Sequence, residues 1–423
     1  MAMARRPAGP RPVFFAATTP GSSQVWAVGL TGFCSFLDVY VTQPILPYLG
    51  HFFHASPAAV GLTISAVTLA MAIAAPLIGI LADRMGRKRL IVTSLLLLVV
   101  PTFLAAQAPG LAALVHWRFI QGLLVPGVFV VTMAYVTEEW ADQRTVAFAM
   151  AIYIAGTVLG GVCGRFLTAV ITAAWGWRTA FEVLAGLTIL LGLAVWRLLP
   201  PSLRFERQEG MQAAVRAAAG HLRNRQLLAT FVIGFNLLFM LVAMFTYVSF
   251  HLAAAPFRLG AAALGFVYFA YLPSLVIIPS AGNWTGRVGQ RRALVLALLA
   301  TGGGALLTLW PALAVILIGL AIASGGLFIA QTAATSYLGV EAETARSSAV
   351  GLYSALYYIG GSLGGVLPGL FWHWLHWNGC IALVLIADAI AITLALRCWR
   401  RRPNVAALGG DAGGWTGWML GRG

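Results

Sequence analysis

The sequence carries very little charge. Only 9% of its 423 residues are Asp, Glu, Lys or Arg, whereas 60% are hydrophobic and the mean hydropathy is +0.87. In soluble domains about a quarter of the residues are charged and about half are apolar. This composition therefore excludes a soluble enzyme and a coiled coil. The apolar residues stand in long continuous runs, not in short alternating segments, which also excludes an outer-membrane β-barrel.

Lysine is almost absent. Lys88 is the only one, and Arg supplies the other 26 of the 27 basic residues. A Walker loop needs a Lys followed by Ser or Thr, and Arg89 follows Lys88, so transport driven by ATP on this chain is excluded. The net charge is +15, but most basic residues stand between apolar runs, as in the cytoplasmic loops of membrane proteins. We therefore expect no nucleic-acid partner.

Cysteine is sparse and has no metal-site or disulfide spacing. The four cysteines, at positions 34, 163, 380 and 398, lie within or at the ends of apolar runs. His373 and His376 stand three apart, but no Cys or carboxylate accompanies them. No constellation of His, Asp or Ser at one membrane face points to an enzyme. We expect no metal, no cofactor and no catalytic activity.

The apolar runs predict an all-α membrane protein with twelve transmembrane helices, since one span needs about 20 apolar residues. Residues 1–23 lack the clean apolar core of a signal peptide, so the first run is interpreted as an uncleaved span. The predicted spans are 24–47, 58–81, 90–108, 112–135, 146–171, 180–199, 226–252, 263–282, 293–310, 312–337, 347–371 and 378–398. A polar linker, 200–225, divides them into bundles 24–199 and 226–398, and the tails are 1–23 and 399–423.

The basic residues predict the orientation of these spans. With the N-terminus inside, 23 of the 27 Arg and Lys residues fall in cytoplasmic segments or at the cytoplasmic ends of spans. Arg178 and Arg258 lie in the opposite loops, and Arg118 and Arg165 lie within spans. This asymmetry predicts that both termini are cytoplasmic.

The chain repeats itself at half its length. Elements of the segment 79–89 recur 203 positions later at 282–292, and elements of 153–162 recur 204 positions later at 357–366. A repeat in the same topology predicts two six-helix bundles related by a pseudo-two-fold axis along the membrane normal. Such parallel repeats are typical of transporters that rock two halves about a midplane site.

The loop between the second and third spans carries GILADRMGRKRL, which resembles the signature of the major facilitator superfamily. The resemblance covers about residues 24–400. It implies that an acid and several bases pair with neighbouring helix ends in one conformation and release them in another. The gating residues implied are Gly79, Asp83, Arg84, Gly86, Arg87, Lys88 and, in the second copy, Arg287. Gly286 stands in the second copy where the first has Asp83. The pairing of this loop with neighbouring helix ends is therefore expected to be strong in the first copy only.

Two further motifs support the resemblance. The fourth span carries RFIQGLL, similar to the family's Arg-x-x-Gln-Gly motif, and the fifth carries GTVLGGVCGR. The second motif is similar to one found in proton-driven exporters, although the usual Gly-Pro pair is absent. Glycines four residues apart share a helix face and allow another helix to approach closely, which explains them equally well. The helix-packing glycines are Gly156, Gly160, Gly164, Gly360 and Gly364.

The first span contains an acid followed by two prolines, in the sequence DVYVTQPILP. Pro44 and Pro47 are expected to kink the helix and free carbonyls that a cavity or a neighbour must satisfy. In the superfamily fold, spans 1, 4 and 5 share one bundle, which implies that Asp38, Arg118 and Arg165 converge. We predict that Asp38 takes up and releases a proton, its ionised form held by one Arg in one state and desolvated in another. A permanent salt bridge is the alternative.

A substrate lining is predicted from aromatic and amide side chains in the spans. Aromatic walls with a few polar groups suit a medium-sized, partly polar organic molecule. The candidates are Tyr40, Gln43, Asn236, Phe239, Tyr268, Tyr271, Gln331, Tyr353 and Tyr357. The other acids are given no coupling role: Asp388 is expected to serve packing or assembly, and Glu138 and Glu139 to be solvated loop residues.

The resemblance thus implies a secondary active transporter that works by alternating access, similar to the drug:proton antiporter-like branch. The leading hypothesis is proton-coupled export of a drug, a metabolite or a siderophore. A proton-coupled importer of a sugar, an organic acid or another nutrient is the alternative, and a non-transporting membrane receptor is the alternative from another class. The expected partners are the substrate, protons and the lipid bilayer of a bacterial inner membrane, with the chain a monomer.

Overall fold

The structure, a computed structural model, describes residues 22–140, 142–202, 220–342 and 346–400. Within these ranges the side chains at 22, 79, 80, 83, 84, 143, 144, 279, 283, 346 and 347 are not described. All regular elements of the described residues are helices. They are α1 (Ser22–Leu37), η1 (Gln43–Ile45), α2 (Leu46–Phe52), α3 (Pro57–Met85), α4 (Arg87–Ala106), α5 (Leu111–Glu139), α6 (Gln143–Trp175), α7 (Trp177–Leu198), α9 (Arg225–Ala253), α10 (Ala261–Val267), η2 (Tyr268–Tyr271), α11 (Pro273–Val288), α12 (Gln290–Leu307), α13 (Leu313–Glu341), α14 (Arg346–Leu370) and α15 (Trp372–Cys398).

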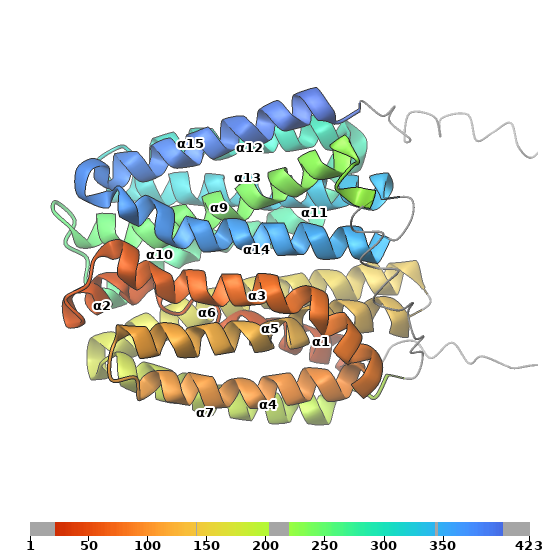
Figure 1. Ribbon diagram of the computed structural model, residues 1–423, viewed down its shortest axis with the longest axis horizontal. Helices are drawn as coiled ribbons and strands as arrows, with labels where there is room; N and C mark the ends of the chain where they lie inside the picture. Colours follow the sequence, from red (N-terminus) through yellow and green to blue (C-terminus); the bar gives the residue numbers. More distant parts are fainter. Residues whose placement is uncertain (1–21, 141, 203–219, 343–345, 401–423) are drawn as a thin grey trace, which may run out of the picture.

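The helices run roughly parallel to one axis and form two bundles side by side, α1 to α7 and α9 to α15 (Figure 1). Helices α3 and α14 pack against each other where the bundles meet. The first described residues and the last lie at the same end of the molecule (Figure 1). This arrangement confirms the predicted all-α fold with two bundles.

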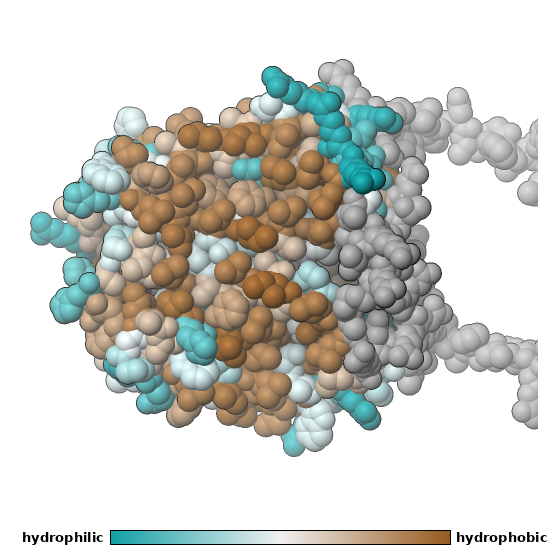
Figure 2. All heavy atoms as spheres, in the orientation of Figure 1, coloured by the Kyte–Doolittle hydropathy of each residue, from teal (hydrophilic) through white to brown (hydrophobic). Residues whose placement is uncertain are grey.

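Ten of the described helical segments are long and apolar enough to cross a membrane. The first and ninth predicted spans also coincide with helices, but these fall outside the ten. Helix α1 is a shorter apolar helix, and α12 has Arg291 and Arg292 in its first turn. Figure 2 shows apolar residues over the middle of the visible face, with hydrophilic ones mainly toward its ends. The chain is therefore a multi-pass membrane protein.

The first predicted span is interrupted. Helix α1 ends at Leu37, and the segment 38–42 leads through η1 into the short α2. Pro44 and Pro47 stand in the first turns of η1 and α2, where the missing N–H of proline does no harm. The corresponding helix of the second bundle, α9, is continuous over 29 residues, so the pseudo-symmetry is broken here.

Glycines set the distance between helices within each bundle. A Cβ atom at Gly160 or Gly164 of α6 would collide with the carbonyl oxygens of Phe33 and Leu37 on α1. A Cβ at Gly360 of α14 would collide in the same way with the backbone of α9. The repeated glycine motif therefore produces the same close helix pair in both bundles.

Candidate functional site

The interrupted segment between α1 and α2 is held by one buried arginine. The last carbonyls of a helix have no partner inside the helix, so they need another donor. Arg118 of α5 donates from Nη1 to the Asp38 carbonyl at 2.7 Å and from Nη2 to the Val39 carbonyl. Its Nε donates to the Thr63 carbonyl of α3 at 3.3 Å. A cation at this position also suits the negative end of the α1 dipole.

The guanidinium of Arg118 is nearly saturated. Nη1 also donates to the Gln121 side-chain oxygen at 2.6 Å, and the Gln121 amide donates to Thr102 at 2.7 Å. Both side chains are buried. In this conformation Arg118 is thus a backbone clamp that joins α1, α3 and α5.

The Asp38 carboxylate accepts no hydrogen bond from Arg118 or Arg165. Its Oδ2 accepts a hydrogen bond from the Thr188 hydroxyl of α7 at 3.0 Å, whereas Oδ1 is buried without a partner. The side chain is 1% exposed and forms no ion pair in the described part of the chain. An unsatisfied buried oxygen costs about 1–3 kcal/mol. Oδ1 is thus the carboxyl oxygen of Asp38 without a hydrogen-bond partner among the described residues.

Arg165 of α6 does not hydrogen-bond to Asp38. Its Nε donates to the Gln43 side-chain oxygen at 2.7 Å, and Nη1 donates to the Gly161 carbonyl at 2.7 Å. The Gln43 amide in turn donates to the Thr246 hydroxyl of α9 at 3.0 Å. This chain of contacts connects the two bundles, so the expected convergence of all three charged groups is wrong for this conformation.

Three tyrosine rings surround the Arg165 guanidinium. The ring centroids of Tyr40, Tyr268 and Tyr271 lie 4.7, 5.1 and 5.2 Å from its central carbon. Tyr268 donates to the Phe245 carbonyl at 2.8 Å, which fixes its ring. One ring belongs to the first bundle and two to the second. The arrangement is a cation–π cage built from both halves.

A second aromatic group lies on α14. The Tyr353 hydroxyl donates to the Gln331 side-chain oxygen of α13 at 2.8 Å, and its ring stacks on Tyr357 at 6.0 Å. Tyr357 contacts Tyr358 at 5.5 Å, and Tyr358 meets Phe129 of the first bundle at 6.4 Å. Sequence reasoning missed Tyr358 and Phe129, although Tyr358 directly follows a predicted residue.

Two predicted lining residues, Asn236 and Phe239, contact other residues of their own helix. The Asn236 amide donates to the Val232 carbonyl at 2.8 Å, and Phe239 stacks on Phe235 at 6.4 Å. All four residues belong to α9. The structure thus groups Tyr40, Gln43, Tyr268 and Tyr271 at Arg165, and Gln331, Tyr353 and Tyr357 beside them.

The loop motif contains a bidentate ion pair. Arg87 donates to the Glu138 carboxylate at 2.7 and 3.0 Å, joining the start of α4 to the end of α5. The expectation that Glu138 is a solvated loop residue is therefore wrong, because α5 extends to Glu139 and brings the carboxylate onto Arg87. Gly86 and its repeat Gly289 have φ values of 83° and 90°, a backbone conformation that favours glycine.

For the other predicted gating residues we describe only their positions in the helices. The backbone of Gly79, Asp83 and Arg84 is helical, but their side chains lie outside the described residues. Lys88 follows Arg87 in the first turn of α4, and Arg287 stands in the last turn of α11.

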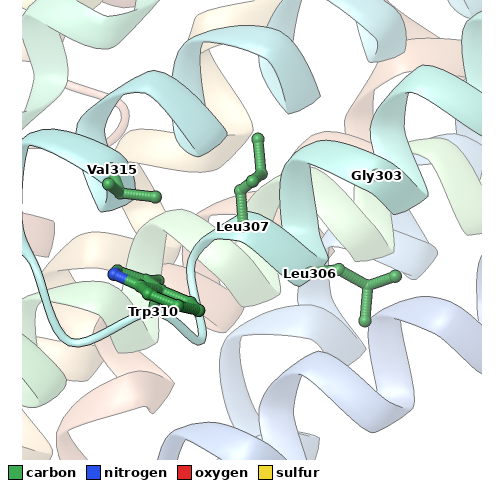
Figure 3. Close-up of a pocket in the computed structure, with 5 residues that line it drawn as sticks. All are labelled: Gly303, Leu306, Leu307, Trp310 and Val315. Carbon is green, nitrogen blue, oxygen red and sulfur yellow. The ribbon is translucent and has the colours of Figure 1, made fainter.

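A separate pocket of about 340 Å³ lies at the turn between α12 and α13 (Figure 3). Its lining residues are Gly303, Leu306, Leu307, Trp310 and Val315, and none of them is charged. Trp310 is 66% exposed. The pocket contacts neither Asp38 nor Arg165, so we do not assign it to the site.

Comparisons with known proteins agree with this fold. The family model of the Major Facilitator Superfamily matches residues 28–273. An uncharacterized transporter of Buchnera aphidicola subsp. Schizaphis graminum is 33% identical over 374 residues, which is 88% of this chain and 90% of that protein. The inner membrane transport protein YnfM of Escherichia coli is also 33% identical over 374 residues, covering 88% and 89% of the two chains.

A solved structure has a similar fold. A bacterial homologue of the human lysosomal transporter Spinster, in an inward-facing and unoccupied conformation, superposes with a TM-score of 0.72. The match covers 90% of this chain and 98% of that one, at 16% sequence identity. At this identity the similarity concerns the fold alone.

Proposed function

This chain is a membrane transporter of the Major Facilitator Superfamily, and we propose that it exports a small organic compound in exchange for protons. One observation carries the proposal. The interrupted segment 38–45 carries the buried carboxyl group of Asp38, whose Oδ1 has no hydrogen-bond partner among the described residues, together with Tyr40 and Gln43, which contact Arg165. Protonation and substrate binding therefore act on the same short piece of backbone.

Arg118 supplies the means of coupling. While Asp38 is neutral, the Arg118 guanidinium donates hydrogen bonds to the carbonyls of Asp38, Val39 and Thr63. Ionisation of the carboxyl places a stronger acceptor beside the same donors, because charge-assisted hydrogen bonds are roughly twice as strong as neutral ones. Arg118 then releases part of the backbone clamp, and the segment that carries Tyr40 and Gln43 is free to move.

Contacts between the bundles support alternating access. At the start of α3 and the end of α14, the Ser65 hydroxyl donates to the Ser362 carbonyl at 2.5 Å and the Ser362 hydroxyl donates back to the Ser65 carbonyl at 3.1 Å. Gly61 and Gly365 approach closely beside this pair. Small neutral residues can separate there without exposing a buried charge.

The test is transport in sealed proteoliposomes, with a pH-sensitive dye and a panel of cationic drugs, sugars, organic acids and hydroxamate chelators. Asp38→Asn fixes a neutral side chain at the coupling site. We expect this variant to lose transport driven by a proton gradient but to keep exchange of labelled for unlabelled substrate. Asp388→Asn is the matched control, since Asp388 is another buried acid, located on α15, and should behave as wild type.

The outcomes separate the possible functions. Uphill transport by Asp38→Asn at the wild-type rate contradicts the proposal. Substrate and proton moving in the same direction identify an importer of a nutrient, because mutual stabilisation of the two ligands gives symport and competition gives antiport. Saturable binding without movement identifies a receptor.

The cellular setting follows from the same proposal. We place the chain in a bacterial inner membrane as a monomer, with both termini in the cytoplasm. The distribution of basic residues supports this orientation. Fusion of alkaline phosphatase to the C-terminus should give an inactive reporter, whereas an active one would reverse the orientation.

A further inference from the structure

We propose that the substrate is an organic anion and that its acidic group binds Arg165 between the two bundles. This inference rests on the proposed transport function and adds the chemical class of the substrate to it. The site offers one guanidinium, several hydroxyl groups and a wall of aromatic rings.

The first argument is charge balance. Arg165 is 6% exposed and lies inside a membrane helix, where a buried arginine is costly unless a partner compensates its charge. Its contacts in the described chain are all neutral: an amide oxygen, a backbone carbonyl and three tyrosine rings. Arg118, by contrast, binds the backbone of a residue that carries a carboxyl group. Arg165 is thus a buried cation without a protein counter-ion among the described residues.

The second argument is the number of unused donors. A guanidinium has five N–H groups, and Arg165 uses one on Gln43 and one on Gly161. Its Nη2 makes no hydrogen bond to the described residues. The donors of Nη2 are therefore unused, and a guanidinium with unused donors suits a carboxylate oxygen.

The third argument concerns the hydroxyls of tyrosines near this guanidinium. Tyr40 and Tyr271 are 6% and 5% exposed, and neither hydroxyl has a hydrogen-bond partner in the described part of the chain. Both rings lie within 5.2 Å of the central carbon of the Arg165 guanidinium. Buried tyrosine hydroxyls usually find a partner. Two such groups beside one cation offer donors to a ligand that supplies the acceptor.

The shape of the site suggests the rest of the ligand. The rings of Tyr353, Tyr357, Tyr358 and Phe129 form a continuous series of contacts from α14 to α5. Such a surface suits a flat or apolar body attached to the acidic group. A cationic compound would be repelled by the guanidinium. The geometry therefore favours an aromatic or apolar carboxylate over a cationic drug or a neutral sugar.

The test measures binding and does not depend on transport. The purified full-length chain is heated in detergent while its tryptophan fluorescence is recorded, with benzoate, salicylate, 4-hydroxybenzoate, cinnamate and hexanoate, each paired with its neutral amide. We expect at least one carboxylate to raise the melting temperature saturably, with the amide binding at least tenfold more weakly. Arg165→Gln should weaken the carboxylate at least tenfold, and Arg165→Lys should do so less.

Arg178 provides a matched control. Its guanidinium also lies over aromatic rings, 4.7 Å from that of Trp177 and 5.4 Å from that of Phe52, but at the first turn of α7 and away from the bundle interface. Arg178→Gln should leave the effect of the carboxylate unchanged. If Arg165→Gln does not fold, the acid–amide comparison on wild type and the Arg165→Lys variant still decide the question.

Several results would overturn the anion site. These are amides that bind as well as acids, a panel in which no carboxylate binds, or an Arg165→Gln variant that keeps its affinity for the carboxylate. A variant that only melts earlier and keeps that affinity shows that Arg165 is a tether between the bundles. Binding without transport contradicts the proposed function and leaves the anion site standing, whereas transport of neutral or cationic compounds without Arg165 does the reverse.

Discussion

Arg118 binds the backbone carbonyl of Asp38 and not its carboxylate. The guanidinium and the carboxyl group belong to neighbouring buried residues, yet the acid turns to Thr188 and the base to the end of α1. Opposite charges that lie close without a direct contact can exchange partners when one of them is neutralised. The proposed proton coupling needs such an exchange of partners, and no salt bridge joins the two side chains in the described conformation.

Removal of the Arg118 side chain should destabilise the protein severely. Arg118→Leu leaves the carbonyls of Asp38, Val39 and Thr63 without their donor, and each unsatisfied buried group costs about 1–3 kcal/mol. We expect a large drop in melting temperature, measured by tryptophan fluorescence in detergent. Arg178→Leu, at a partly exposed site, should cost much less. Equal melting temperatures for the two variants would show that Arg118 does not clamp the segment.

The Arg87–Glu138 pair should show strong coupling in a double-mutant cycle. The two side chains are 5% and 21% exposed, and their bidentate contact holds the start of α4 on the end of α5. Glu138→Gln removes the charge from a bidentate, charge-assisted contact, so we expect a loss of about 1–3 kcal/mol of stability and slower transport. Exchange of the two residues, Arg87→Glu with Glu138→Arg, should recover part of both. Additive effects of the single changes would argue against a functional pair.

A methyl group at Gly160 should be poorly tolerated. The added Cβ would collide with the Phe33 carbonyl, so α6 and α1 would have to separate. Overpacking of this kind costs about 1–3 kcal/mol, and we expect Gly160→Ala to melt earlier and transport more slowly. Gly186 of α7 has no atom within 4 Å of its Cβ position and serves as the control. Gly186→Ala should be neutral or slightly stabilising, since alanine favours helices by about 1 kcal/mol over glycine.

A cysteine pair at Ser65 and Ser362 should lock the conformation described here. Each serine hydroxyl bonds to the other residue's carbonyl, so α3 and α14 are in direct contact at this point. In a background without the four native cysteines, Ser65→Cys with Ser362→Cys should cross-link on oxidation and stop transport, and reduction should restore it. Either cysteine alone is the control. Undiminished transport by the cross-linked chain would contradict alternating access at this contact.

The sequence predicted that the first span is distorted, but it did not predict where each helix breaks. Pro44 and Pro47 predicted a kink of the first span that frees carbonyls. The span is broken here, but the carbonyls that Arg118 binds belong to Asp38 and Val39 and are not those four residues before either proline. The break begins earlier than the prolines, directly after Leu37. The repeat predicted two similar bundles but could not show that α9 stays continuous while the next span is divided by η2. Backbone breaks at the site therefore differ between the bundles.

The hydrogen-bond partners of the buried charged residues could not be predicted from the sequence. Arg118 and Arg165 were recognised as unusual because charge within an apolar span is costly, whatever surrounds it. The group that each one binds depends on which side of a helix faces which neighbour. Asp38 meets Thr188 across 150 positions, and Arg165 meets Gln43 across 122. No local pattern encodes such contacts.

The sequence by itself determined the membrane location, the spans and the two-bundle repeat, because these depend on apolar length, loop charge and glycine spacing. The tertiary structure decided which groups meet: a carboxyl group left with one free oxygen, a guanidinium that clamps backbone, and another enclosed by tyrosines from both bundles. Hydrogen bonds and cation–π contacts act over a few ångströms. Their partners are therefore set by how helices distant in the chain pack and rotate against one another.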